Sequence, residues 1–163
     1  MNANEAGAPG AETRGHGPGE TAPSSERDAQ QLTGPALSFG LSAEVEGLRA
    51  EPAWERFDRN AKTLVKDGAF RVVLTALKAG AALDEHRVTA RVMVQTVTGH
   101  LRLHLSAPDA AVLDLPAGHL AVLQPGITHR VEAVEESAFL LTVAGLTDEG
   151  VQADSRSPAP SAA

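Results

Sequence analysis

Histidine is the residue type that offers the most chemistry in this sequence. Six histidines occur, and five of them lie in the central part of the chain: His86, His100, His104, His119 and His129. An imidazole ring can bind a transition metal or move a proton near neutral pH. Cysteine is absent, which removes thiolate nucleophiles, sulfur-ligated zinc and disulfides. Any metal site would therefore use nitrogen and oxygen donors, which suit iron, manganese, nickel or zinc.

Three basic residues alternate with leucines in one short segment. His100, Arg102 and His104 take every second position, and the leucines lie between them. Because side chains alternate between the two faces of a strand, the basic residues share one face and the leucines belong to the core. We interpret the basic face as a solvated sheet surface, with a second anion-binding or metal site as the alternative.

Several other functional classes lack their sequence signals. Neither Ser38 nor Ser42 lies in a Gly-X-Ser-X-Gly motif, and the sequence has no glycine-rich phosphate loop. A formal charge of -7, one Trp and no Tyr argue against nucleic acid as a partner. No apolar run approaches the roughly 18 residues of a membrane helix, so no membrane partner is predicted. We expect a soluble, cytoplasmic protein.

The apolar residues are concentrated in one part of the chain. Among Val, Ile, Leu, Phe, Trp and Tyr, the first 34 residues contain only Leu32. This bias predicts a disordered N-terminal arm over residues 1–34 and a disordered tail over 147–163. Between them we predict a helical packing arm over 35–59 and a β-barrel over 60–146.

The packing arm has helical spacing. Leu41, Val45 and Leu48 recur at the period of an amphipathic helix, with Ser42 as its predicted N-cap. Pro52 cannot lie comfortably inside a helix, so it either starts a second turn or ends the element.

The barrel region consists of short β-type segments. They are rich in Val, Leu and Thr, are separated by Gly, Pro and Asp, and leave no room for crossover helices, so the predicted fold is all-β and antiparallel. We expect hairpins in sequence order. The eight predicted segments are Thr63 to Lys66, Phe70 to Lys78, Arg91 to Val97, Leu101 to Ser106, Ala110 to Leu115, His119 to Leu123, Thr128 to Val134 and Ala138 to Ala144.

The segment from Gly118 to His129 resembles the second signature motif of the cupin superfamily. That motif reads Gly, five residues, Pro, one residue, Gly, two residues, His. Here Gly118, Gly126 and His129 keep their spacing, and Pro125 comes one position late. The resemblance is strongest to small uncharacterised bacterial cupins, and it implies a jelly-roll β-barrel.

The segment from Gly80 to Gly99 resembles the first cupin motif. In the family this motif contains His-X-His and then a glutamate, which with the histidine of the second motif make four metal ligands. His86 keeps the first ligand position, whereas Val88 and Val92 occupy the positions of the second histidine and the glutamate. Two of the four ligands are thus hydrocarbon, which cannot bind a cation.

The resemblance implies a pocket inside the barrel. It places His86 and His129 near each other, as an incomplete metal pair, and the remaining pocket residues are predicted to be Val88, Val92, Val94, Ile127 and Leu140. The apolar walls favour a protein that binds a small organic molecule without an obligatory metal.

Two alternatives remain open. The first is a metal-dependent enzyme of the dioxygenase or isomerase type, in which Glu85 or Gln95 helps His86 and His129. The second is a ligand-free structural module that pairs through its sheet. We also predict a homodimer, because the strand over residues 70–77 is apolar on both faces and open sheet edges need pairing or cover.

Overall fold

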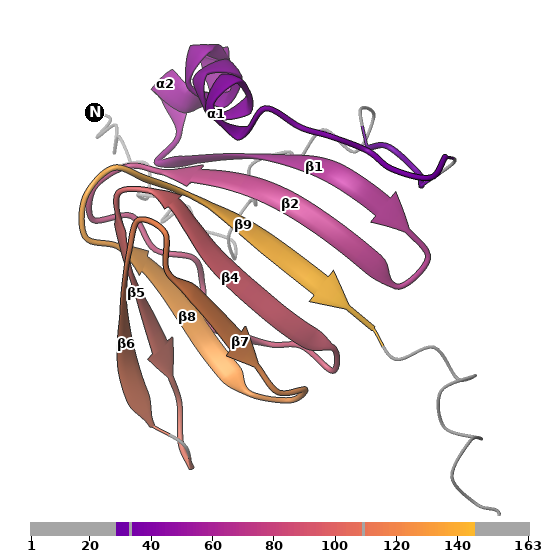
Figure 1. Cartoon of the computed structure of the whole chain (residues 1–163). Coiled ribbons are helices and arrows are strands. Elements are labelled where there is room, and N and C mark those ends of the chain that lie inside the picture. Colours follow the sequence, from indigo (N-terminus) through magenta and orange to yellow (C-terminus); the bar gives the residue numbers. More distant parts are fainter. Residues whose placement is uncertain (1–28, 33, 109, 146–163) are drawn as a thin grey trace, which may run out of the picture.

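A computed structural model describes residues 29–32, 34–108 and 110–145 of the chain (Figure 1). In this part of the chain two helices precede a series of strands. The helices are α1 (Leu41–Ala50) and α2 (Pro52–Arg56). The strands are β1 (Arg59–Asp67), β2 (Phe70–Leu77), β3 (His86–Arg87), β4 (Arg91–Thr98), β5 (His100–Leu105), β6 (Ala111–Pro116), β7 (Leu120–Leu123), β8 (Thr128–Ala133) and β9 (Ser137–Ala144).

The strands form two sheets that face each other. The five-stranded sheet has the order β1-β2-β9-β4-β7, and the four-stranded sheet has the order β3-β8-β5-β6. All the strand pairs within these sheets are antiparallel. Figure 1 shows the two layers, with the helices above β1 and β2. The predicted all-β, antiparallel jelly roll with a short helix before it is therefore confirmed.

The expectation of hairpins in sequence order is wrong for most of the chain. Only β1–β2 and β5–β6 are consecutive strands that pair, whereas β9 lies between β2 and β4, and β8 between β3 and β5. The chain therefore passes repeatedly from one sheet to the other. At the passage from β4 to β5 the connection is Gly99, whose φ of 80° is a left-handed conformation that favours glycine.

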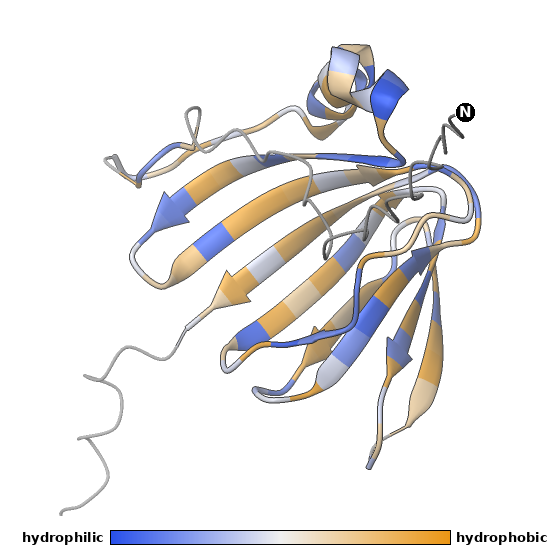
Figure 2. Cartoon of the chain, turned by 180° about the vertical axis from the view of Figure 1, so that it is seen from behind, coloured by the Kyte–Doolittle hydropathy of each residue, from blue (hydrophilic) through white to orange (hydrophobic). Residues whose placement is uncertain are grey.

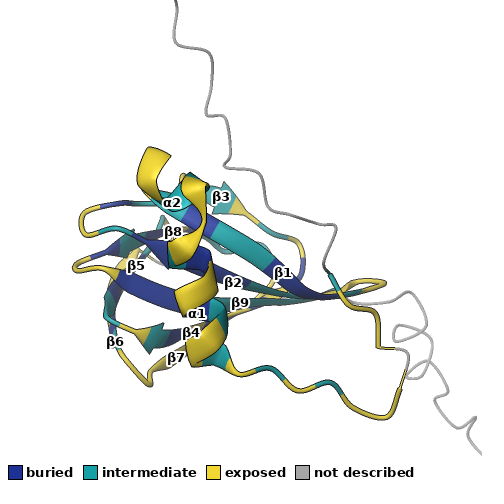
Figure 3. Ribbon diagram, turned by 90° about the horizontal axis from the view of Figure 1, so that it is seen from above, coloured by how far each residue is buried: buried dark blue, intermediate teal, exposed yellow. Residues whose placement is uncertain are grey.

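Two apolar cores lie on opposite faces of the five-stranded sheet. The inner core fills the space between the sheets and includes Leu77, Leu101, Leu103 and Phe139. The outer core lies between the five-stranded sheet and the helices, and Leu74 belongs to it. Figure 2 shows apolar and polar positions alternating along many strands, and Figure 3 shows that α1 and α2 are largely exposed on the side away from the sheet.

Both faces of β2 are covered within a single chain. Leu74 and Ala76 pack under the helices, and Leu77 packs in the inner core. The two-sided apolar pattern of this strand, which suggested a homodimer, therefore needs no second copy. Dimerisation stays a prediction. Exposed apolar side chains occur on two edge strands, where Leu120 and Val122 of β7 are 50% and 59% exposed and Val112 of β6 is 55% exposed.

The helical arm differs from the prediction in its first turn. α1 begins at Leu41 with Gly40 as its N-cap and no side-chain cap, so the assignment of Ser42 as the N-cap is wrong. Pro52 begins α2, where its missing N–H costs nothing. Buried Asn60 ties the arm to β1, because its side-chain amide donates to the Leu48 carbonyl (2.9 Å) and to the Glu51 carboxylate (2.8 Å).

The segment before the helices was predicted to be disordered. Within it, residue 30 is placed: the Gln30 N–H donates to the Leu64 carbonyl (3.1 Å), and the Lys66 N–H donates to the Gln30 carbonyl (3.0 Å). Residues 1–28 and 33 of the predicted arm, and the predicted tail over 147–163, lie outside the described residues. Among the described helices, none is long and apolar enough to cross a membrane.

Candidate functional site

His86 and His129 lie side by side at one edge of the four-stranded sheet. His86 is on the two-residue strand β3, which pairs with the start of β8 so that His86 is directly opposite His129. The centroids of the two rings are 4.4 Å apart, and the ring planes are tilted by 56°. Cross-strand pairing of two extended segments thus brings together residues that are 43 positions apart (129 minus 86) in the sequence.

Each ring has one nitrogen fixed by the backbone. His129 Nδ1 is 2.9 Å from the Ile127 carbonyl oxygen, and His86 Nδ1 is 3.1 Å from the Asp84 carbonyl oxygen. A carbonyl can only accept, so Nδ1 carries the proton and donates it in both rings. In the neutral ring, Nε2 then has a free lone pair. His129 is 1% exposed, and its Nε2 has no hydrogen-bond partner among the described residues.

Burial keeps His129 neutral. Loss of solvent lowers the pKa of His129 below its ordinary value of 6.5, the hydrogen bond to Ile127 partly opposes this, and the neighbouring His86 lowers the pKa further. The lone pair on Nε2 is therefore available at neutral pH. A buried acceptor without a donor costs about 1–3 kcal/mol, so this position is a candidate contact for a ligand.

Acid should destabilise the protein through His129. Between the ordinary pKa of 6.5 and the lower pKa of folded His129, the unfolded chain binds more protons, so the free energy of unfolding falls as the pH falls. The slope from this group is at most about 1.4 kcal/mol per pH unit. Urea unfolding at about pH 7.5 and about pH 5.5 measures the loss. His129→Gln should reduce it, whereas His119→Gln, at an exposed position, should not. Equal acid loss in wild type and His129→Gln would contradict the argument.

Two neighbouring cavities open at the mouth of the barrel. One has a volume of about 330 Å³ and is lined by Arg59, Leu83, Asp84, His86 and Leu141. The other has a volume of about 380 Å³ and is lined by Gly68, Ala69, Arg71, Val88 and Val143. Leu141 of the first cavity and Val143 of the second are alternate residues on one face of β9, so both cavities lie along the same side of this strand.

Three of the predicted pocket residues, all valines, lie in the barrel or at its mouth. Val88 lines the mouth, and it packs against the inner core. Val92 and Val94 are 2% and 0% exposed inside the barrel, where hydrocarbon fills the space between the sheets. A ligand would therefore contact the mouth of the barrel and not its centre.

Two of the predicted pocket residues lie elsewhere. Leu140 packs in the outer core, on the face of β9 that is covered by the helices, and its neighbour Leu141 faces the mouth. Ile127 lines a separate, smaller cavity beside Arg87 and Thr128. The assignment of Leu140 and Ile127 to the barrel pocket is therefore wrong.

The donor set is too small for a full metal site. Gln95 is exposed on β4, where it pairs with Leu120, and Glu85 accepts a hydrogen bond from the Ser106 hydroxyl. Among the described residues, no group of three or more His, Cys, Asp or Glu could hold a metal ion. The pair of imidazoles has the tautomer that metal ligands adopt, but the remaining coordination positions lack protein donors.

The basic residues of β5 share one exposed face, as predicted. Carboxylates lie next to them: His100 Nε2 is 3.1 Å and Arg102 Nε is 3.4 Å from Asp114 Oδ1, and His104 Nε2 is 2.7 Å from Glu132 Oε2. These carboxylates disfavour the anion-binding alternative. The solvated-surface interpretation therefore fits this face.

Sequence reasoning missed Arg59, Arg71 and Leu141 at the barrel mouth. For Leu141 the missing information was which alternate residues of β9 face the barrel, because this strand is apolar on both faces. For Arg59 a usable signal existed. The alternation of Arg59, Ala61 and Thr63 continues the predicted strand backwards, so extending that strand would have placed Arg59 on its inner face.

Comparisons with known proteins support the fold. No protein-family model matches the sequence, and no curated protein matches it significantly. A conserved protein of unknown function from Streptococcus pyogenes has a similar structure, with a TM-score of 0.51 and 24% identity over 55% of this chain and 75% of that one.

Two further solved structures are cupins. A cupin superfamily protein from Desulfitobacterium hafniense gives a TM-score of 0.51 and 11% identity over 54% of this chain and 78% of that chain. An RmlC-like cupin from Shewanella frigidimarina gives a TM-score of 0.50 and 16% identity over 58% of this chain and 82% of that chain. The topology, the two motif histidines and these likenesses agree, and the chain has the fold of the cupin superfamily.

Proposed function

We propose that this protein binds a small organic molecule at the mouth of its barrel, beside His86 and His129, without a complete set of metal ligands. The observation that carries the proposal is the Nε2 atom of His129, which is buried and without a hydrogen-bond partner among the described residues. A donor group of the ligand would satisfy this acceptor. Burying the lone pair then costs nothing in the complex, which favours binding.

The lining of the mouth indicates the kind of ligand. Leu83 and Leu141 in one cavity, and Val88 and Val143 in the other, supply apolar walls. Apolar walls with polar groups among them are usual for a site that binds a small organic molecule, and here the polar groups are Arg59, Arg71, Asp84 and His86. The ligand we expect has an apolar body and at least one hydroxyl or N–H group that donates to the imidazole pair.

A thermal-shift screen of small uncharged metabolites tests the proposal. A ligand at about 100 times its Kd stabilises the folded state by about 2.7 kcal/mol, which raises the melting temperature by several degrees. His129→Ala should abolish the shift for any hit, and the matched variant His119→Ala, at an exposed histidine, should keep it. Hits whose shifts are identical in wild type and His129→Ala would rule out this site.

A metal-dependent enzyme is the second candidate. It is favoured by the shared tautomer of the two histidines, in which Nδ1 is held by a carbonyl and Nε2 is free. His86 and His129 would hold the ion, and water or substrate would have to fill the positions that the valines leave without donors. The metal content of the purified protein separates the two candidates.

A further inference from the structure

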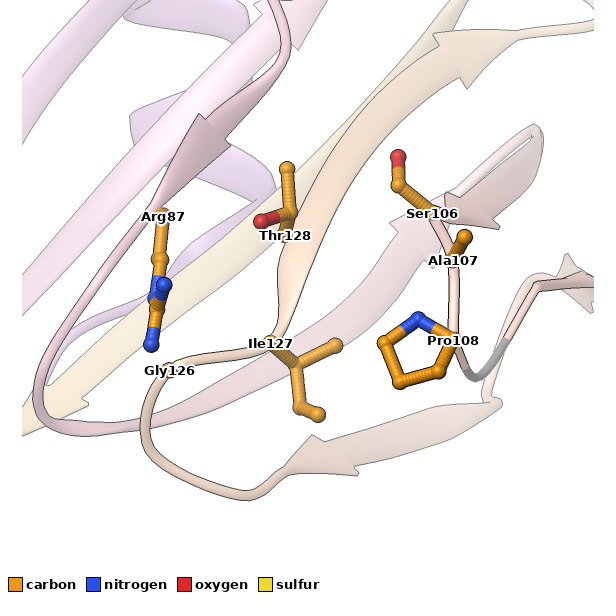
Figure 4. A pocket seen from close by; sticks show the side chains of 7 residues that line it. All are labelled: Arg87, Ser106, Ala107, Pro108, Gly126, Ile127 and Thr128. Carbon is orange, nitrogen blue, oxygen red and sulfur yellow. The ribbon is translucent and has the colours of Figure 1, made fainter.

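We propose that the outer face of the four-stranded sheet carries a second binding site, for a short aliphatic carboxylate. The site is a cavity of about 160 Å³ at the end of β3, β8 and β5. Its lining residues are Arg87, Ser106, Ala107, Pro108, Gly126, Ile127 and Thr128 (Figure 4). It is separate from the cavities at the barrel mouth, with which it shares no lining residue.

Three polar residues of this cavity lie in register across neighbouring strands. Arg87 on β3 is directly opposite Thr128 on β8. The Ser106 N–H, just after β5, donates to the Thr128 carbonyl at 3.0 Å. Figure 4 shows these side chains around the same space, with Arg87 on one side and Pro108 on the other. The folded sheet itself therefore assembles the polar part of the site.

Gly126 makes room for the guanidinium of Arg87. A Cβ atom built on Gly126 would lie 3.2 Å from Arg87 Nη2, and the φ of Gly126 is +82°. The bare glycine thus lets the guanidinium lie against the backbone between β7 and β8. Arg87 has no side-chain partner among the described residues, and it is the sole charged residue in the lining. A guanidinium that lies against the backbone and is not paired with a carboxylate suits an anionic ligand.

The number of free donors favours a carboxylate over a phosphate. The Ser106 hydroxyl already donates to Glu85 Oε2 at 2.5 Å, so it cannot also donate to a ligand. Arg87 and the Thr128 hydroxyl remain, which matches an anion with two oxygens. Glu85 also adds a negative charge at the rim, which opposes a multiply charged anion.

The apolar residues of the lining indicate what the carboxylate ligand carries besides its charged group. Ala107, Pro108 and Ile127 present hydrocarbon to the cavity. An alkyl chain of a few carbons would cover these groups, whereas inorganic phosphate offers nothing to contact them. The ligand class is therefore a small monocarboxylate with an aliphatic tail.

The two sites share strands but use opposite faces. His86 and His129 point toward the barrel, and their neighbours Arg87 and Thr128 point outward, because adjacent side chains on a strand alternate. Variants of one site should therefore leave the other intact. Failure of this proposal would say nothing about the barrel mouth, and the reverse also holds.

An NMR titration of the full chain with propionate tests the proposal. Saturable shifts are expected for the backbone amides of residues 106, 107 and 126–128, which line the cavity. Arg87→Met should weaken binding at least about tenfold, because a charge-assisted hydrogen-bond pair is lost, and Arg87→Lys should fall between this variant and wild type. Thr128→Val should weaken binding about threefold.

Three controls complete the experiment. Arg91→Met, at an exposed arginine of the other sheet, should bind propionate like wild type. Acetate and inorganic phosphate should bind more weakly than propionate. The proposal is overturned if propionate gives no saturable shifts at these amides, if Arg87→Met binds as tightly as wild type, or if phosphate binds more tightly than propionate.

Discussion

Replacing Val88 by histidine is expected to create a zinc site that holds about one equivalent of metal, because three imidazoles and a water complete a tetrahedral shell. Val88 lies just beyond β3, two positions after His86, and its side chain packs against the inner core, on the barrel side. His129 is already 4.4 Å from His86 between ring centroids. Val88 is only half-buried, so the fold should accept the larger ring.

Metal analysis of Val88→His after incubation with zinc and gel filtration measures this gain. The matched control is Val122→His, which adds a histidine at a 59% exposed position on β7, away from the pair. The control should gain no stoichiometric metal. Adding His129→Ala to Val88→His should remove the metal again. If Val88→His and Val122→His bind equally little zinc, position 88 does not face the histidine pair.

Replacing Gly99 by alanine is expected to cost about 3 kcal/mol or more of unfolding free energy. A Cβ atom at this position would lie 2.4 Å from Ser137 Oγ and 2.5 Å from the Glu136 carbonyl oxygen. The φ of +80° adds strain for any residue with a side chain. Since the Glu136 atom belongs to the backbone, the chain between β8 and β9 would have to move.

Gly80 offers the matched control for this substitution. Its φ is +78°, and a Cβ atom there would meet nothing within 4 Å. Gly80→Ala should therefore pay only the conformational cost, about 1–2 kcal/mol. Urea unfolding of both variants separates the free-energy cost of the close Cβ contacts from the cost of the positive φ. Equal losses in the two variants would show that close packing at Gly99 contributes little.

Local patterns in the sequence predicted the strands but not how they are ordered in the sheets. The alternation His100, Leu101, Arg102, Leu103 places β5 and its inward face correctly. The order β2-β9-β4 depends on contacts between segments far apart in the chain, which no local pattern encodes. β3 was missed because it has two residues and no alternation to detect.

The candidate site was predictable only where a motif fixed it. Motif spacing identified His86 and His129, which the structure brings into ring contact. Strand β9 carried no such signal. Both its faces are covered, one by the helices and one by the inner core, so Leu140 and Leu141 are equally apolar and the sequence does not distinguish the inward one.

The histidine pair has the chemistry of an incomplete metal centre. Each ring offers a free Nε2, and Nε2 of His129 is buried without a partner among the described residues. Metal sites with two protein imidazoles leave the other positions to water or substrate, which weakens retention of the ion. A hydrogen bond from an organic ligand needs only this one lone pair and no further protein donors. The apolar side chains at the mouth also favour an organic ligand over a metal ion.

Metal content of the untagged protein is the measurement that addresses this account most directly, since an affinity tag would add histidines of its own. The protein should be purified without chelator and analysed for iron, manganese, nickel and zinc. We expect less than about a tenth of an equivalent of each metal per chain. About one equivalent of a single metal in wild type, lost in His129→Ala, would contradict the account and favour the metal-dependent enzyme.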